Sequence, residues 1–264
     1  MLAADVLLTA NADEKARVGR AFRRACLKEP ASTLGAPPDV PARPAAPELV
    51  APRHLRKRGL GTPSGRAALL HAIAHIELNA IDLSADMVAR FADAPELAGS
   101  RDAFIRDWSG VCDDECRHFA MIQERLGALG HAYGDFPAHD GLWQAAQSTA
   151  DDIAARLAIA PLVLEARGLD VTPGMIERLD GVGDRESADV LRVIYAEEVA
   201  HVHAGMRWFR HVAEARGKAP RPYFRALVQS RFRGRVKPPF NVPARNSAAF
   251  PEEYYRNLRS SAPV

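Results

Sequence analysis

The spacing of apolar positions predicts long amphipathic helices over most of this chain. From Pro63 to about Gly217, apolar residues recur three and four positions apart, and the period-2 alternation of a half-buried strand is almost absent. Turn formers divide this region into segments. The long helices that we predict cover residues 64–93, 95–129, 141–169 and 185–216.

Within this frame, three details of the chain are expected to shape the third and fourth helices. Pro161 predicts a kink in the third helix, because proline removes a backbone donor. A break is expected at Asp170–Gly174, followed by the short segment MIERLDGV. Asp184 is a suitable N-cap for the fourth helix.

The two ends of the chain have a different character from its middle. A short amphipathic helix is expected at 12–27, and the Pro- and Ala-rich residues 30–52 predict an extended linker. The region after 217 is irregular and basic, with a helix expected at 221–232. We therefore predict an all-α four-helix bundle with an N-terminal arm and a C-terminal tail that packs on it. The domain limits are 1–62, 63–217 and 218–264.

Composition narrows the class of protein without identifying it. The chain has 264 residues, 47% hydrophobic and 26% charged, as in ordinary soluble domains, and its net charge of +2 is too small to indicate nucleic acid binding. We find no apolar run of membrane-spanning length and no secretory signal, so we expect no membrane association. Cys26, Cys112 and Cys116 form neither a disulfide framework nor a zinc-type spacing, which favours the cytoplasm.

Each of the four predicted long helices carries one glutamate on an apolar face. In every case the residues three and four positions away, which share that face, are apolar or histidine. A buried carboxylate must be protonated, paired or bound to metal, and no lysine or arginine lies on these faces. The four residues are Glu77, Glu115, Glu165 and Glu198.

Two of these glutamates begin a Glu-x-x-His motif. Glu115 is followed by His118 and Glu198 by His201, and at this spacing both side chains reach the same point beside a helix. Chance alone gives about half an occurrence of this motif in such a chain, so the motif is informative only together with Glu77 and Glu165. One Glu from each of two helices and one Glu-x-x-His from each of two others bind two metal ions in ferritin-like bundles. Neutral imidazole suits iron, manganese or zinc.

An acid precedes each motif, and we expect it to belong to the layer around the metals. Asp114 and Glu197 could accept the free ring N–H of a metal-bound histidine on the facing helix. We place Arg117 in the same layer. Tyr195, one turn before Glu198, either fills the core or lies beside the metals, and we include it in this layer.

The four glutamates reach one level of the bundle only with a particular connectivity. Glu77 and Glu115 match across a turn near residue 94 to within roughly 6 Å, at about 1.5 Å of rise per residue. Glu115 and Glu165 match only if their helices run parallel. Residues 130–140 must then form a crossover, which could span roughly 36–40 Å when extended.

Other polar residues have simpler interpretations. We expect a partly buried structural role for His75, a surface or neighbouring-layer position for His71, and a loop contact for His139. Asp82 and Asp86 are predicted to lie on a solvated face. Cys112 and Cys116 are predicted to be core residues, and the arginines of the tail a solvated surface, with phosphate contact as the alternative.

Several long segments resemble a known family. HAIAHIELNAIDL, DDECRHF, AHDGLW, PLVLEARGLDVTP, EEVAHVHAGMRWF and KPPFNVPAR are similar to the uncharacterised ferritin-like family catalogued as domain of unknown function 455, over roughly residues 50–250. The Asp-Glu-x-Arg-His segment more distantly resembles bacterial di-iron monooxygenases, and the overall pattern resembles the di-iron tRNA hydroxylase. The resemblance implies a carboxylate-bridged di-iron centre that activates O₂. The second motif departs from it, with Ala200 in place of the arginine.

We therefore expect a di-iron oxidoreductase, an oxygenase or oxidase, acting on O₂ and a small-molecule substrate. Two iron ions are the expected cofactor, with manganese or a manganese–iron pair as alternatives. An electron-donor protein and a second copy of the chain are candidate partners. The alternative functions are an iron-handling ferroxidase, a metal-stabilised scaffold without turnover, and a tRNA-modifying hydroxylase, the last motivated by the basic tail.

Overall fold

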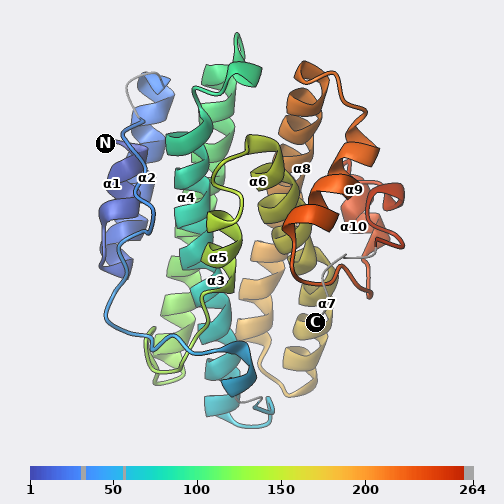
Figure 1. The fold of residues 1–264 in the computed structure, drawn as a ribbon. Coiled ribbons are helices and arrows are strands. Elements are labelled where there is room, and N and C mark those ends of the chain that lie inside the picture. Colours follow the sequence, from blue (N-terminus) through green and yellow to red (C-terminus); the bar gives the residue numbers. More distant parts are fainter. Residues whose placement is uncertain (31–33, 56–57, 259–264) are drawn as a thin grey trace.

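The computed structural model describes residues 1–30, 34–55 and 58–258, and the regular elements of this part of the chain are helices (Figure 1). Within these residues the only strand-like pairing is an isolated bridge between Leu49 and Ala138. Parts of the predicted linker and arm (31–33 and 56–57) and of the tail (259–264) lie outside the described residues. The predicted all-α bundle is confirmed.

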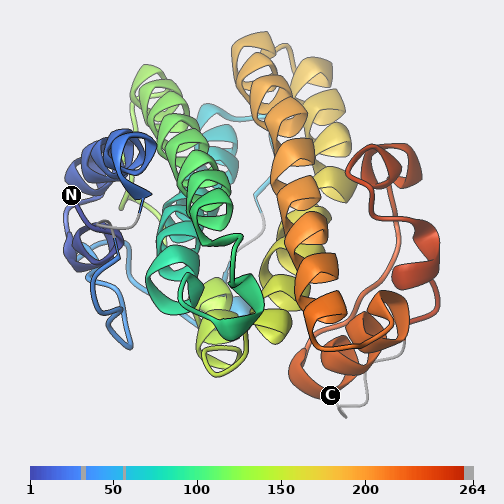
Figure 2. The same ribbon diagram turned by 90° about the horizontal axis from the view of Figure 1, so that it is seen from above.

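The bundle consists of two antiparallel helix pairs, which Figure 2 views from above. In the first pair, α3 (Pro63–Phe91) turns through the short helix η3 (Pro95–Leu97) into α4 (Arg101–Ala128). In the second pair, α7 (Ala166–Gly181) is followed by α8 (Arg185–Ala215), and α4 packs against α8. Asp184 caps α8 by accepting the amide of Ser187, as predicted.

The two pairs are connected by a crossover, as the levels of the glutamates require. In Figure 1 the chain leaves the lower end of α4, rises alongside α3 through α5 (Gly141–Gln147), and descends again through α6 (Ile153–Ile159). The π-helical turn η4 (Ala160–Glu165) follows and leads directly into α7. Helix α4 and the α6–α7 rod therefore run parallel, and this prediction is confirmed.

The predicted single helix over 141–169 is wrong, because a turn at 148–152 separates α5 from α6. The hydroxyls of Ser148 and Thr149 each donate to the carbonyl of Ala145, at 2.9 Å. The carboxylate of Asp152 then accepts the amide of Ala154 and starts α6. Short polar side chains compete with the helix for its own backbone groups, and here they end one helix and begin another.

The predicted break at Asp170–Gly174 is also wrong, because α7 continues through Pro173 to Gly181. Proline at 173 leaves the carbonyl of Leu169 without its usual helical donor. The side-chain amide of Asn241 donates to that carbonyl at 3.1 Å and takes the place of the missing bond. A residue far along the chain thus permits the helix to pass through a proline.

The predicted kink at Pro161 takes the form of the π-helical turn η4. Gly205 on α8 faces this turn, and a Cβ atom at that position would lie 2.5 Å from Cβ of Pro161. Only glycine permits such a close approach of α8 to η4. The turn thereby brings Glu165, its last residue, alongside α8.

Segments from both ends of the chain cover the bundle. Helix α1 (Ala3–Leu8) packs on α3, and α2 (Ala12–Lys28), predicted at 12–27, packs on α4. The short helix η2 (Pro52–His54) ends the described part of the linker before 56–57.

At the other end, α9 (Pro220–Arg231), predicted at 221–232, packs on α6 and α8. Helix α10 (Val242–Ser247) packs on α7 and α8, and η5 (Glu252–Tyr254) packs on α9.

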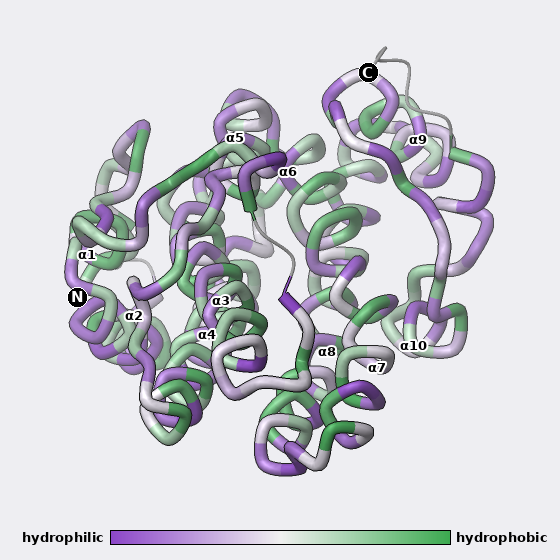
Figure 3. Tube along the Cα trace, turned by 90° about the horizontal axis from the view of Figure 1, so that it is seen from below, coloured by the Kyte–Doolittle hydropathy of each residue, from purple (hydrophilic) through white to green (hydrophobic). Residues whose placement is uncertain are grey.

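Hydrophobic and hydrophilic residues alternate around the turns of the helices, as amphipathic packing requires (Figure 3). None of the helices in the described part of the chain combines the length and the apolar character needed to cross a membrane.

Candidate metal centre

Four of the predicted ligands meet in the core between α3, α4 and α8. Glu77, Glu115, His118 and Glu198 each contribute one ligand atom, and these atoms lie within 4.8 Å of one another. The first three residues are buried and Glu198 is nearly so, with 13% of its side chain exposed. The structure therefore contains a buried group of oxygen and nitrogen atoms that could hold a metal ion.

Glu115 lies between the two predicted histidines. Its Oε2 is 3.4 Å from Nδ1 of His118, and its Oε1 is 3.1 Å from Nδ1 of His201. The two imidazole rings have centroids 5.8 Å apart. Glu198 also lies between them, because its Oε1 is 3.4 Å from Nδ1 of His201 and 3.9 Å from Nδ1 of His118. Both carboxylates can therefore face two ligand positions at once.

The other two glutamates differ in how closely they join this arrangement. Oε2 of Glu77 is 3.4 Å from Nδ1 of His118. Glu165 is outside the four-residue group, but the negative charges of Glu198 and Glu115 act on it. Burial and these charges raise the pKa of Glu165 to about 8. The structure thus brings the six predicted residues into one neighbourhood, with Glu77 beside His118 and Glu165 close enough for the charges of Glu198, Glu115 and His201 to act on it.

Several buried atoms of this cluster have no hydrogen-bond partner. A buried polar atom without a hydrogen bond destabilises the folded state unless a ligand or ion binds it. Among the described residues, no lysine or arginine forms an ion pair with any of the four glutamates. The unpartnered atoms are both carboxylate oxygens of Glu115, Nδ1 of His118, Nδ1 of His201 and Oε2 of Glu165. A set of oxygen and imidazole ligands aimed at one space fits a first-row metal ion.

In the metal-free protein, bound protons offset the negative charge of the four glutamates. Burial alone would lower the pKa of His118, but the carboxylates of Glu115 and Glu77 raise it to about 11. Burial likewise opposes charging of His201, whose pKa is nevertheless raised by Glu198 and Glu115. Burial and the charge of Glu115 raise the pKa of Glu77 well above its usual value. Burial would raise the pKa of Glu115 too, but the two histidines lower it. Metal ions and protons therefore compete for the same atoms.

The outer ring nitrogen of each histidine, Nε2, is hydrogen-bonded to one acid. Nε2 of His118 is 2.7 Å from the carboxylate of Glu197, and Nε2 of His201 is 3.3 Å from that of Asp114. Each acid thus reaches the histidine of the opposite motif, on the facing helix. With the Nε2 proton donated to an acid, the Nδ1 lone pair of each ring faces the glutamates, as a metal ligand requires.

Arg117 connects these two acids. Its guanidinium donates to Glu197 at 2.8 Å and to Asp114 at 2.7 Å. One arginine on α4 therefore serves both motifs, which accounts for Ala200 at the corresponding position of the second motif. Arg117 is 37% exposed, so this connection lies at the edge of the bundle rather than in its centre.

Tyr195 makes a contact that the sequence analysis did not predict. Its hydroxyl accepts a hydrogen bond at 2.8 Å from the side-chain amide of Asn241, the residue that also supports α7 at Pro173. Among the described contacts, Tyr195 links α8 to the C-terminal extension rather than to the glutamates. Its assignment to the layer around the metals remains a prediction.

The prediction that Asp82 and Asp86 lie on a solvated face is wrong, because both are completely buried. Asp82 pairs with Lys15 of α2 and, at 3.1 Å, with Arg43 of the linker. Asp86 pairs with Arg156 of α6 and, at 2.8 Å, with Arg90.

A signal for this burial was present in the sequence. The stretch from Ile81 to Val88 is apolar on every side except at these two acids and Ser84. A helix that is apolar all round is typically buried all round.

Three other histidines lie at the crossover. His75 is buried and structural, as predicted: its Nδ1 accepts from the Tyr133 hydroxyl at 2.8 Å. His139 accepts the amide of Gly141 within its loop, also as predicted. His71 is 1% exposed, which excludes the surface position, one of the two that we predicted for it. It stacks on Tyr133 at 5.2 Å and accepts the amide of Gly134.

Comparison with known proteins identifies relatives without an assigned activity. The chain is 42% identical over 213 residues to an uncharacterised protein of Haemophilus influenzae (strain ATCC 51907 / DSM 11121 / KW20 / Rd), a match that covers 80% of this chain and 74% of that protein. No solved structure matches. The family model described as "Protein of unknown function (DUF455)" matches residues 8–256, almost the entire chain. The chain therefore belongs to this family.

Proposed function

We propose that the cluster binds two metal ions, iron in the first place, and that the protein is an O₂-dependent di-iron oxidoreductase. The observation that carries this proposal is the position of Glu115. Its two unpartnered oxygens each face a different unpartnered imidazole nitrogen, at 3.4 Å and 3.1 Å. A carboxylate that must satisfy two histidine positions in a buried core has the chemistry of a bridging ligand.

The contacts divide the six residues into two sets. His118 and Glu77 would hold one ion, because their ligand atoms are 3.4 Å apart. His201 and Glu165 would hold the other. Glu115 and Glu198 would be shared, since each lies within 4 Å of Nδ1 of both histidines.

The surrounding residues support ligand orientation and exclusion of water. Asp114 and Glu197 fix the ring orientation of the histidines and increase their basicity, and Arg117 fixes the two acids. When bound, a carboxylate-bridged pair of iron ions supplies the redox chemistry by which O₂ is reduced and an organic substrate is oxidised. Manganese or a manganese–iron pair would fit the same oxygen and nitrogen donors.

The alternative functions, iron storage and tRNA modification, would each require a particular kind of protein surface. Iron storage requires compact subunits that form cages, whereas both ends of this chain add helices to the outside of the bundle. A tRNA substrate would be bound by arginines of the tail. Two of them are already engaged by the protein, because Arg225 donates to the carbonyls of Tyr254 and Arg256, and Arg231 pairs with Asp151 at 2.9 Å. The net charge of only +2 also gives a nucleic acid little attraction, and we therefore favour a small organic substrate.

Metal analysis combined with absorption spectra tests the proposal. Purified protein is loaded with Fe(II) without oxygen, passed through a desalting column, and analysed for iron before and after exposure to O₂. We expect about two retained ions per chain, as in other di-iron bundles, and new near-ultraviolet absorption after oxidation. Oxygen uptake that continues with excess reductant would support an oxidoreductase, whereas uptake proportional to added iron would support a ferroxidase. Failure to retain iron or manganese would contradict the metal site itself.

A further inference from the structure

The backbone around Glu165 is less regular than the backbone around the other three predicted glutamates. Glu165 ends the π-helical turn η4, and Pro173 lies further along α7. A π-helical turn replaces the usual helical hydrogen bonds by wider ones, and proline removes a donor. Helices α3, α4 and α8 contain no proline beyond their first position. The path of the chain at Glu165 therefore depends more on bonds from outside its own helix.

Such bonds come from residues 237–245 of the C-terminal extension, here called the 237–245 segment. The side-chain amide of Asn241 donates to the carbonyl of Leu169 at 3.1 Å. The guanidinium of Arg245 donates to the carbonyl of Ala166 at 3.2 Å. Both carbonyls belong to the start of α7, directly after the predicted ligand. The segment therefore binds the backbone that determines where this ligand lies.

The 237–245 segment is itself held firmly against α7. Arg245 is 2% exposed and pairs with the carboxylate of Asp170 at 2.8 Å and 2.7 Å. Its guanidinium also lies 4.3 Å from the centre of the Tyr255 ring. In the other direction, Arg167 of α7 donates to the carbonyl of Pro239 at 2.9 Å. Bonds in both directions favour a single position of the segment on the helix.

The side chain of Asn241 also reaches α8. Its amide nitrogen donates to the Tyr195 hydroxyl at 2.8 Å as well as to the carbonyl of Leu169, so both of its N–H groups are used. Its side-chain oxygen accepts the amide of Ala244 at 3.3 Å, and this bond fixes which way the side chain is turned. Tyr195 lies three residues before Glu198. One side chain therefore connects α7 with α8, close to a predicted ligand on each helix.

Apolar packing alone does not fix η4 on this side of the bundle. A cavity of about 110 Å³ lies here, and its lining includes Leu162 and Val163 from η4 and Phe240 and Tyr255 from the C-terminal extension. Side chains that face a cavity lack contacts on that side. The cavity thus leaves room for η4 to shift, and the hydrogen bonds of the 237–245 segment restrict such a shift.

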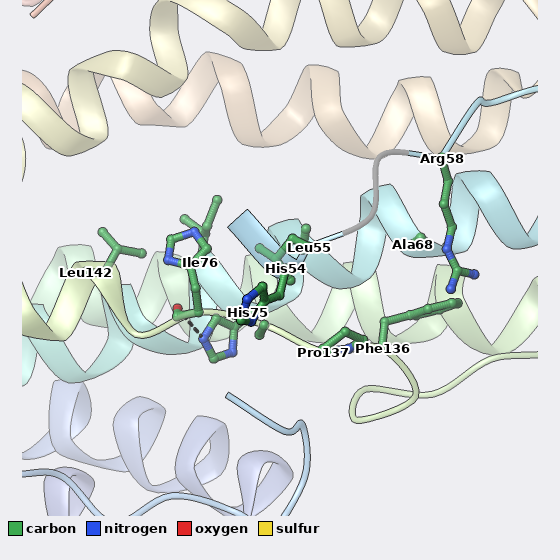
Figure 4. A pocket seen from close by; sticks show the side chains of 12 residues that line it. His54, Leu55, Arg58, Ala68, His75, Ile76, Phe136, Pro137 and Leu142 are labelled. Atoms are coloured by element: carbon green, nitrogen blue, oxygen red, sulfur yellow. Dashed lines mark hydrogen bonds between the residues drawn. The ribbon is translucent and has the colours of Figure 1, made fainter. Parts of the chain in front are cut away.

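Helix α3 provides the contrast. The crossover lies on this helix, and the ring of His75 donates to the carbonyl of His139 at 3.2 Å (Figure 4). However, α3 is continuous α-helix from Pro63 to Phe91, so its own hydrogen bonds determine the backbone at Glu77. The crossover covers a helix that is complete, whereas the 237–245 segment completes one that is not.

We propose that Asn241 is a positioning residue of the metal centre, which holds α7 and α8 at the spacing that lets Glu165 and Glu198 bind the same ion. This inference rests on the proposed di-metal site. Metal binding then depends on the docked 237–245 segment. Because such coupling is reciprocal, a bound metal in turn stabilises the docking of the segment.

Metal affinity of the full-length protein, measured by competition between the protein and a chelator for Fe(II) without oxygen, tests this role. Asn241→Ala removes the bonds to both helices, and we expect a loss of affinity of about tenfold or more, as for other residues that orient metal ligands. Tyr195→Phe removes only the bond to α8 and should cause a smaller, several-fold loss. Circular dichroism under the assay conditions shows that each variant is folded when its affinity is measured.

Arg225→Ala is the matched control within the same extension. Arg225 donates to the carbonyls of Tyr254 and Arg256, so these bonds reach neither α7 nor α8. This variant should bind Fe(II) with the affinity of the unchanged protein, even if it unfolds at a lower temperature.

Hydrogen exchange followed by mass spectrometry measures the reciprocal effect. The backbone amide of Asn241 donates to the carboxylate of Asp170 at 2.9 Å, so its exchange reports on the docking of the segment. Fe(II) should slow exchange in peptides that cover 240–245 in the unchanged protein, and much less in Glu165→Gln.

The outcomes separate this role from the metal site itself. Failure of the unchanged protein to retain Fe(II) would overturn both the proposed function and this inference. Retention with equal affinity in Asn241→Ala, or in Tyr195→Phe if Asn241→Ala does not fold, would overturn the positioning role alone. Equal losses of affinity in Asn241→Ala and Arg225→Ala would also overturn it, because the effect would then be a general one of the extension.

Discussion

Helix α3 carries two kinds of buried acid within three turns. Asp82 and Asp86 each meet cations of the chain: Lys15 and Arg43 for the first, Arg90 and Arg156 for the second. Glu77, one turn earlier, meets no lysine or arginine among the described residues. Its neighbours are two further glutamates and a histidine. The two regions solve the same problem, the burial of a carboxylate, in different ways.

The difference indicates which acids belong to the fold and which to the site. A buried acid that is paired with a lysine or arginine of the chain is neutralised within the protein. Its partners also connect separate segments of the fold. A buried cluster that exceeds the available cations needs protons or metal ions. The aspartates therefore bear on stability, and the glutamates on ligand binding. Each prediction below would break this distinction if it failed.

The largest expected effect is the loss of metal binding in Glu115→Gln. A neutral amide keeps the shape of the side chain but cannot serve as an anionic ligand shared by two positions. We expect iron retention to be abolished while the metal-free protein still unfolds cooperatively, as seen by calorimetry and circular dichroism. Glu124→Gln, at an exposed position of the same helix, is the matched control and should retain iron normally. Equal retention in both variants would remove Glu115 from the site.

The next effect is a loss of stability in Arg156→Ala. Arg156 is 1% exposed and donates to Asp86, to the Thr149 hydroxyl at 2.9 Å and to a carbonyl at 2.7 Å. Removing one partner of a buried pair costs about 3–5 kcal/mol of unfolding free energy.

Arg192→Ala, which removes a partly exposed partner of Asp180 and Asp189, is the control and should cost less than about 1 kcal/mol. Urea denaturation of metal-free protein measures both. A small loss for Arg156→Ala, or a parallel loss of metal affinity in the folded variant, would contradict the division into two regions.

A smaller effect is expected for the acids that hold the histidines. Asp114→Asn or Glu197→Gln keeps the side-chain shape but weakens the bond to His201 or His118. Metal affinity should fall by about 10–100-fold, measured by competition with a chelator. Because both acids are about one-third exposed, the stability of the metal-free protein should change little. An unchanged affinity would show that the outer bonds do not orient the rings.

A further effect, which needs no substitution, is the pH dependence of metal affinity. Glu77, Glu165 and both histidines have raised pKa values, about 8 for Glu165 and about 11 for His118, so they hold protons at neutral pH in the metal-free protein. Metal binding must displace these protons. Affinity should therefore rise with pH, by about tenfold per pH unit for each proton released below its pKa.

Chelator competition between about pH 6 and pH 7.5 measures this slope. Glu165→Gln removes one of the titrating groups and should make the slope shallower. Affinity that is independent of pH would contradict the proton-filled cluster.

Much of the fold followed from local pattern, and the failures have a common cause. Apolar periodicity predicted α3 and α8 within about two residues, because their core-facing stripes are long and regular. The errors at 148–152 and at Pro173 concern single hydrogen bonds. The Thr149 hydroxyl helps to end a helix by bonding a carbonyl four residues earlier. Asn241 instead lets α7 continue, by bonding the carbonyl of Leu169, 72 residues earlier in the chain. The periodicity of apolar residues contains no information on either bond.

The same limit separates the two groups of acids. The glutamates could be identified from the sequence because their ligand set recurs at fixed spacing on predicted helices. For the aspartates, the apolar stretch around them indicated burial, but their partners could not be identified, because Lys15 and Arg43 reach Asp82 from segments whose position depends on the whole fold. The role of Arg117 as a connection between both motifs was equally inaccessible, since it requires α4 and α8 to be side by side.

The exchange of acids between the motifs has a consequence for assembly. Each Glu-x-x-His helix supplies a histidine but not the acid that orients it, which comes from the other helix. Neither α4 nor α8 alone therefore carries a preorganised half-site, although each contains a complete motif. Correct ring orientation is a property of the docked helix pair, so a preorganised metal site requires α4 and α8 to be packed against each other.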